Sequence, residues 1–229
     1  MNIDELGSLL SKMRIVDLSK KIEPGKVDTP LGKRKYEIKS FIFPPGEIMH
    51  NIEMESHIST HLEAPSHWVP ARYGRPAEDI SEVCLDRFFG PAVLIDCKDM
   101  APRTPLDAGN ISRFPVREND IVLVGNCSYR GKERCAMTRE GMEYLVSKKM
   151  KMIGFDETVF VEDPKHFPRK METYFTHDLT LPAGIPIIEV LDNLGALTRP
   201  RFLFMGFPAK MGGLESFPIR AVAFEDMDR

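Results

Sequence analysis

Several features that mark particular classes of protein are missing from this sequence. It has no apolar run near the roughly 18 residues that a membrane-spanning helix needs, and its first residues lack the basic segment of a secretory signal. Its net charge of −3 lacks the basic excess that nucleic-acid binding usually requires. We therefore expect a cytoplasmic protein with neither a membrane nor a nucleic-acid partner.

Two common functional motifs are also missing. No Gly-x-Ser-x-Gly elbow occurs, so serine-hydrolase chemistry lacks its usual scaffold. The cysteines show no C-x-x-C spacing, which argues against a zinc ribbon and a thioredoxin-like motif. We expect reduced, mostly buried thiols at Cys84, Cys97, Cys127 and Cys135.

Length and composition predict one soluble globular unit. A hydrophobic content of 42% and a charged content of 28% are ordinary for such proteins. A chain of 229 residues is long enough to bury a sizeable core. We expect a single domain over residues 1–229.

The unusual feature that is present is a cluster of histidines. Only six histidines occur in the chain, yet three of them share one eleven-residue stretch with an acidic residue. Imidazole and carboxylate groups bind divalent metals or transfer protons. The candidate residues are His57, His61, Glu63 and His67.

Local sequence predicts how this stretch is folded. The spacing of His57 and His61 would suit two zinc ligands on a helix, but Pro65 and β-branched neighbours disfavour one. Residues 52–58 alternate apolar and polar types, which predicts a half-buried strand arriving at His57. Residues four apart in a straight strand lie about 13 Å apart, whereas ligand atoms lie about 2 Å from one ion. The chain must therefore bend, and we predict the turn at residues 59–60.

The stretch resembles a family signature. It is similar to the pattern H-x-G-T-H-x-D-x-P-x-H of the metal-dependent cyclase superfamily, which includes bacterial kynurenine formamidase and isatin hydrolase. Two positions depart from the pattern, because Ser59 replaces glycine and Glu63 replaces aspartate. Serine adopts a positive φ less easily than glycine, and the longer glutamate moves the carboxylate, which can retune or weaken a metal site.

The resemblance extends over nearly the whole chain, from about Ile15 to Phe224. It includes an opening D-L-S strand, a G-P-A-V segment, the context I-E-x-L-x-N-L around Glu189 and a closing P-x-R-A-V-A strand. It implies an α/β fold of the swivelling β/α/β type, with a central mixed sheet rolled toward a barrel and peripheral helices.

One part of this fold follows from the residues alone. Residues 121–124 form an aliphatic run, and residues 152–156 form a second strand-like segment. Between them, residues 138–149 begin with a threonine suited to an N-cap and end in lysines, as a helix should. We predict a βαβ unit with a parallel strand pair.

The resemblance also implies roles for individual residues. His57, His61 and Glu63 would bind a divalent metal, Zn²⁺ or Mn²⁺, and His177 and Glu189 would complete a second ion or an outer shell. A metal lowers the pKa of bound water toward about 7, and His67 would act as the catalytic proton shuttle. Trp68, the only tryptophan, would form an apolar wall for substrate or pack in the core.

The expected function is a metal-dependent hydrolase that acts on an amide, formamide, lactone or cyclic amide bond of a small molecule. The alternative is a non-hydrolytic cyclase, or a ligand-binding relative whose catalysis is altered by Ser59 and Glu63. The resemblance implies a homodimer or homotetramer.

Overall fold

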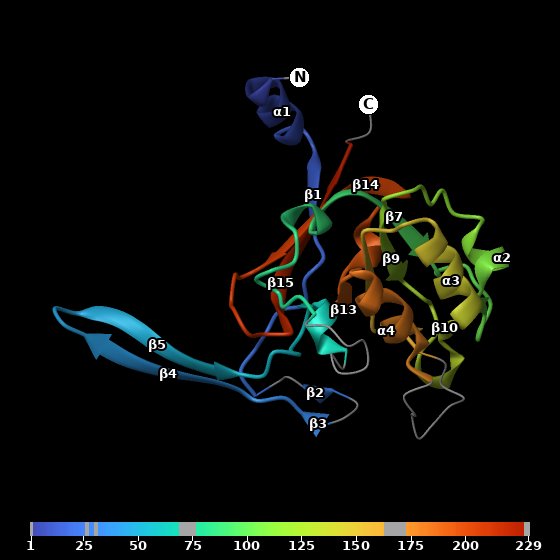
Figure 1. The fold of residues 1–229 in the computed structure, drawn as a ribbon. Helices are drawn as coiled ribbons and strands as arrows, with labels where there is room; N and C mark the ends of the chain where they lie inside the picture. The colour runs from blue at the N-terminus through green and yellow to red at the C-terminus, as the bar shows by residue number, and fades with distance from the viewer. Residues whose placement is uncertain (1, 26–27, 30–31, 69–76, 163–172, 227–229) are drawn as a thin grey trace.

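The computed structural model of the protein describes residues 2–25, 28–29, 32–68, 77–162 and 173–226. Its centre is an eight-stranded mixed sheet with the order β1-β15-β14-β7-β9-β11-β13-β6 (Figure 1). The sheet closes on itself because β6 also pairs with β15, and β1 is added outside this closure. The prediction of an α/β fold with a sheet rolled into a barrel is confirmed. The strands are β1 (Arg14–Asp17), β6 (His61–Glu63), β7 (Phe89–Asp96), β9 (Ile121–Gly125), β11 (Met152–Asp156), β13 (Ile187–Leu191), β14 (Arg201–Pro208) and β15 (Ser216–Glu225).

The predicted βαβ unit is present. Strands β9 and β11 are parallel neighbours, and helix α3 (Arg139–Ser147) connects them. The hydroxyl of Thr138 accepts a hydrogen bond from the backbone N–H of Gly141, so threonine is the N-cap. The remaining helices are α1 (Ile3–Leu10), α2 (Ala108–Ile111) and α4 (Phe175–Thr180), and short 3₁₀ segments include η1 (Pro65–His67).

Two hydrophobic clusters fill the described part of the molecule, one on each face of the sheet. In β9, Val122 and Val124 join a cluster with helix α3, whereas Ile121 and Leu123 join a cluster formed by the strands of the closed sheet. Both faces of β9 are therefore buried, which explains its continuous aliphatic sequence. Figure 1 shows α2, α3 and α4 on the outer side of the sheet.

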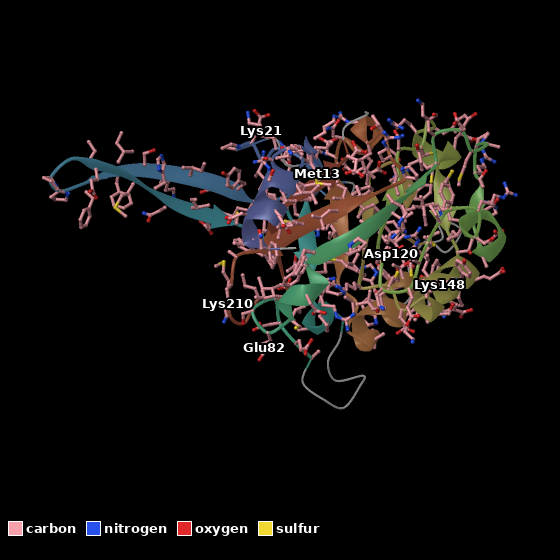
Figure 2. All side chains as sticks on the ribbon, turned by 90° about the horizontal axis from the view of Figure 1, so that it is seen from above. Met13, Lys21, Glu82, Asp120, Lys148 and Lys210 are labelled. Carbon is pink, nitrogen blue, oxygen red and sulfur yellow. The ribbon has the colours of Figure 1, made fainter. Side chains whose placement is uncertain are left out.

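A long hairpin stands apart from this body. Strands β4 (Tyr36–Phe43) and β5 (Glu47–Met54) pair with each other and project away from the barrel, as both views show (Figures 1 and 2). Nearly all of their residues are exposed. The predicted half-buried strand over residues 52–58 is therefore wrong, because β5 ends at Met54 and no other strand of the described chain pairs with the hairpin.

Small elements complete the described chain. A parallel three-stranded sheet is formed by β8 (Pro105–Leu106), β10 (Cys135–Met137) and β12 (Val159–Phe160), and a short ribbon by β2 (Asp28–Thr29) and β3 (Gly32–Lys33). Three of the four cysteines are buried free thiols, as predicted, and Cys84 is exposed. Among the described helices, none has both the length and the apolar character that crossing a bilayer requires. A cytoplasmic location stays a prediction.

Candidate metal centre

The turn predicted at residues 59–60 brings two histidines together. Ser59 has a φ of 55°, a left-handed conformation that glycine adopts more easily. Its hydroxyl donates a hydrogen bond of 2.6 Å to the carbonyl of Lys20, which helps to hold serine in this conformation. The reversal places His57 Nδ1 3.2 Å from His61 Nε2.

Thr60 fixes this turn to the rest of the sheet. Its hydroxyl donates to the carbonyl of Val190 at 2.6 Å and accepts from the backbone N–H of Lys20 at 2.8 Å. Strand β6 follows at once, and its alternation buries Leu62 among the strands of the closed sheet. His61 and Glu63 therefore lie on the opposite face of the sheet.

Three potential ligand atoms form a compact triangle. Glu63 Oε1 lies 3.1 Å from His57 Nδ1 and 3.6 Å from His61 Nε2, and the two nitrogens are 3.2 Å apart. Ligands that bind Zn²⁺ tetrahedrally at 2.0–2.1 Å are separated by about 3.3 Å. The triangle therefore fits three ligands of one divalent ion.

The second carboxylate oxygen of Glu63 faces a further histidine. Oε2 lies 3.3 Å from Nε2 of His177 on α4, but it accepts no hydrogen bond of good geometry from any described residue although it is buried. A buried polar atom without a hydrogen bond is uncommon in proteins. A cation bound between Glu63 and His177 would satisfy it.

His177 is held by a buried carboxylate that the sequence did not reveal. Glu162 Oε1 lies 2.9 Å from His177 Nδ1, and the same carboxylate accepts a hydrogen bond from the backbone N–H of Thr176 at 3.1 Å. Because a carboxylate accepts, Nδ1 carries the hydrogen and Nε2 faces Glu63. Burial would lower the pKa of His177, but its hydrogen bond to Glu162 and the nearby carboxylate of Glu63 raise the pKa to about 10.

Glu215 plays the corresponding part for His57. Its Oε1 lies 2.9 Å from His57 Nε2, and it also accepts a hydrogen bond of 3.0 Å from the hydroxyl of Ser56. At His61, Nδ1 donates to the carbonyl of Ser59 at 2.8 Å. In His57, His61 and His177, one ring nitrogen (the outer one) is therefore hydrogen-bonded to an oxygen, and the other (the inner one) faces the carboxylate of Glu63. This is the usual arrangement of metal-binding histidines.

A second carboxylate adds negative charge to the same place. Glu189 on β13 pairs in register with His61. Burial raises the pKa of Glu189, and so does the nearby charge of Glu63. Burial would likewise raise the pKa of Glu63, but its contacts with His177, His57 and His61 lower it well below the usual range. Two carboxylates in one buried site repel each other, and a cation would relieve this repulsion.

His67 occupies the open side of the cluster. Its Nε2 lies 3.6 Å from Glu63 Oε1, its side chain keeps 27% of its surface exposed, and its ring centre is 4.5 Å from that of His57. Burial lowers the pKa of His67, and the positive charges of His57 and His177 lower it further. The negative charge of Glu63 acts in the opposite direction but does not outweigh them. A neutral, partly exposed imidazole can exchange protons with a reacting group.

Trp68 lies beside this cluster and also belongs to the core. Its indole N–H donates to Asp178 Oδ1 at 3.2 Å, and its ring centre lies 5.3 Å from that of His177. It packs in the cluster that contains α3 and α4. Both interpretations offered by the sequence, core packing and an apolar wall beside the site, are thus compatible with its position.

Five of the residues proposed for the site from the sequence lie in one cluster: His57, His61, Glu63, His67 and His177. Trp68 lies beside it, and Glu189 pairs in register with His61. Glu162 and Glu215 were missed, because they lie far from residues 57–67 in the sequence and carry no motif of their own. Among the described residues, three groupings have ligand atoms within 4.8 Å of one another: His57, His61 and Glu63; Glu63, His67 and His177; and His57, His67 and Glu215. Nitrogen and oxygen donors without thiolate do not select strongly between Zn²⁺ and Mn²⁺.

Comparison with known proteins agrees with this geometry. The Cyclase family, described as "Putative cyclase", matches residues 16–160, which is more than half of the chain. The chain belongs to the Cyclase family. The resemblance seen in the histidine stretch is therefore confirmed. No curated protein sequence matches the chain.

Several solved structures share the fold over nearly their whole length. Isatin hydrolase A from Labrenzia aggregata superposes with a TM-score of 0.81 at 22% identity, covering 98% of this chain and 99% of that one. Isatin hydrolase A from Ralstonia solanacearum gives 0.80 at 20% identity, covering 98% and 97%. A predicted metal-dependent hydrolase from Bacillus stearothermophilus gives 0.71 at 22% identity, covering 93% and 98%. At these identities the similarity establishes the shared fold.

Proposed function

We propose that this member of the Cyclase family is a metal-dependent hydrolase. His57, His61 and Glu63 would hold a divalent ion, Zn²⁺ or Mn²⁺, and His177 and Glu189 would bind a second ion or support the first. The observation that carries the proposal is the common orientation of three imidazoles around one buried carboxylate, with the outer nitrogens bonded to Glu215, Glu162 and the carbonyl of Ser59.

A residue of the chain, His67, would then transfer the proton of the attacking water. A divalent ion, when bound, activates water and polarises a carbonyl group. His67 lies at the exposed edge, where it can take a proton from the attacking water and pass it to the leaving amine or alcohol. Its lowered pKa keeps it neutral, and therefore basic, near pH 7.

The proposed substrates are small molecules with an amide, formamide, lactone or cyclic amide bond. Two structural relatives are named isatin hydrolases, which supports a cyclic amide as the first compound to test. Trp68 beside His177 offers a flat apolar surface to such a ring.

The decisive experiment measures metal and activity together. The purified protein, supplied with Zn²⁺ or Mn²⁺, should bind metal and hydrolyse at least one of N-formylkynurenine, isatin or a simple lactone. His61→Ala should lose the metal, because it removes an inner nitrogen that the turn cannot replace. Glu118→Gln, which changes an exposed carboxylate paired with Lys149, is the control and should keep it. A protein that binds no metal, or a His61→Ala variant that retains it in full, would contradict the proposal.

A non-hydrolytic cyclase or a ligand-binding protein is the second candidate. It is favoured by Ser59 and Glu63, the two departures from the family signature. Stoichiometric metal without hydrolysis of any of these compounds would support it over the hydrolase.

A further inference from the structure

Two buried thiols lie beside each other outside the candidate metal centre. Cys127 Sγ lies 3.6 Å from Cys135 Sγ, and the two residues are 1% and 0% exposed. Cys127 follows the end of β9, and Cys135 begins β10. The chain between them is exposed at residues 128–132, so the pair is joined by a surface loop. Because a disulfide places its sulfurs about 2.05 Å apart, the two thiols need to approach by only about 1.5 Å to form one.

The thiol of Cys97 makes the two cysteines chemically unequal. The neighbouring thiols of Cys97 and Cys127 lower the pKa of Cys135 to about 6, although burial acts in the opposite direction. The proximity of Cys135 and burial raise the pKa of Cys97, and burial raises that of Cys127. Cys97 Sγ donates to the carbonyl of Ile95 at 3.6 Å. Cys135 is therefore the thiol that loses its proton most easily, and the thiolate is the reactive form of cysteine.

We propose that Cys127 and Cys135 form a redox site, in which hydrogen peroxide converts the two thiols into an intramolecular disulfide. The disulfide weakens metal binding at the candidate centre, and this consequence rests on the proposed function. The oxidant is a small peroxide because both thiols are buried. A thiolate with a second thiol beside it is the usual arrangement of cysteines that are oxidised reversibly.

The oxidation takes place in two steps. The thiolate of Cys135 attacks one oxygen of the peroxide, so an S–O bond forms, the O–O bond breaks and hydroxide leaves. Cys127 then attacks the sulfenic sulfur of Cys135, so the S–S bond forms, the S–O bond breaks, and water leaves with the proton of Cys127. The proton first released by Cys135 converts the hydroxide into a second water. Two thiols are oxidised to one disulfide, and one peroxide is reduced to two waters.

Both cysteines are attached to the segment that follows β11, residues 157–162. The backbone N–H of Cys127 donates to Thr158 Oγ1 at 2.7 Å. Cys135 pairs with Val159 in the parallel ladder of β10 and β12. Protein interiors are close-packed and transmit small displacements. Drawing the two sulfurs together therefore displaces this segment.

The same segment contacts the candidate metal centre at two places. Glu157 forms an ion pair with Lys20, and the carbonyl of Lys20 accepts the hydrogen bond that holds Ser59 in its turn. At the end of the segment, Glu162 lies 2.9 Å from His177 Nδ1 and orients the ring. A displaced segment thus disturbs both the histidine turn and the orientation of His177.

Mass spectrometry of peroxide-treated protein tests the disulfide. Cys84 is first changed to serine, because it is exposed and could join two chains. Peptide mapping should then find Cys127 joined to Cys135, and dithiothreitol should separate them. Cys97→Ala removes a third buried thiol as the matched control and should retain the bond. Cys127→Ala should stop at the sulfenic acid of Cys135, which dimedone traps. Absence of the Cys127–Cys135 bond, or a bond between Cys97 and Cys135 in its place, would overturn the redox site.

Zinc affinity before and after oxidation tests the consequence for the metal centre. Competition with a chelator should show an affinity about 10-fold lower in the oxidised protein, the lower end of the effect of disturbing groups that orient ligating histidines. Cys127→Ala should have the affinity of the reduced protein both before and after treatment, with an unchanged circular dichroism spectrum. Equal affinities of the oxidised and reduced protein would overturn the link. A protein that binds no zinc when reduced would contradict the proposed function instead, and the disulfide could still be mapped in it.

Discussion

At the scale of single residues, Ser59 shows how this chain accommodates a departure from the family signature. The left-handed conformation at this position disfavours any side chain, and the hydrogen bond from its hydroxyl to Lys20 compensates. Ser59→Ala keeps the strain and loses the bond, so we expect it to lower the free energy of unfolding by about 1 kcal/mol. Ser59→Gly loses both the strain and the hydrogen bond, so its free energy of unfolding should be close to that of the original protein. Urea unfolding of the two variants measures this difference, and equal losses would show that the hydroxyl is not compensating strain.

Glu162 is a residue whose effect should appear in metal affinity. It holds His177 Nδ1 and thereby directs Nε2 at Glu63. Glu162→Gln should weaken metal binding by about 10–100-fold, the usual effect of a carboxylate that orients a ligating histidine. Competition with a chelator gives the affinity, and the exposed Glu118→Gln serves again as the control. An unchanged affinity would remove His177 from the proposed ligands.

His67 and Glu63 should respond differently to substitution. His67→Ala should retain metal but lower kcat by roughly 10² to 10⁴, the usual contribution of a positioned acid or base. Glu63→Asp keeps the charge and donor type, so it should bind metal with altered affinity or preference. Metal analysis beside turnover distinguishes the two roles, because loss of metal in both variants would make His67 a ligand.

At the scale of secondary structure elements, strand β13 shows how the fold directs Glu189. Gly154 and Asp156 on β11 pair with Ile188 and Leu191, so β13 contains one extra residue in this interval. The bulge lets Ile188 and Leu191 pack in the same cluster while Glu189 lies toward the candidate metal centre.

Val190 occupies this bulge with a φ of 60°, which a β-branched residue rarely adopts. A valine-to-glycine change normally destabilises a strand, but here it should leave stability unchanged or raise it by up to about 1 kcal/mol, because glycine removes the strain. The denaturation midpoint of Val190→Gly measures this effect. A clear loss of stability would mean that the side chain of Val190 matters more than its backbone conformation.

The sequence predicted elements well where a local pattern was sufficient. The strand, capped helix and strand between residues 121 and 156 needed only apolar runs and a threonine before the helix. Helix α4 was not predicted, because its six residues are too short to show a helical period. The exposure of β5 could not be predicted either, since alternation of apolar and polar residues does not show whether a strand packs on the barrel or projects from it.

At the scale of the whole molecule, the sequence could single out candidate site residues because most of them share one short stretch or a family context, and their roles stay predictions. Glu162 and Glu215 depend on the closed sheet, which brings distant segments to the same histidines. The extent of the domain, residues 1–229, and the oligomeric state stay predictions.

The stability of the metal-free protein should depend on pH through His177. Its pKa is raised from 6.5 to about 10, so the folded state favours the protonated ring. This contribution is complete below pH 6.5 and is lost as the pH rises toward 10. Thermal or urea unfolding of metal-free protein should show this decline, and His177→Gln should flatten it. Bound metal should oppose the decline, because a ligating imidazole must be neutral. An equal slope in His177→Gln would assign the effect to other groups.

The closure of the barrel has a consequence for the order of events during synthesis. Strand β6 pairs with residues 187–189 on one side and 216–218 on the other, so the strand pairings that close the barrel join parts of the chain more than 120 residues apart. Contacts of such long range form late in folding. Glu63 cannot pair with Ser216, nor His61 with Pro218, until these residues of β15 have left the ribosome. An unfinished chain would therefore carry its histidine stretch in a form that holds metal weakly, and the ion would be acquired as one of the final steps of maturation.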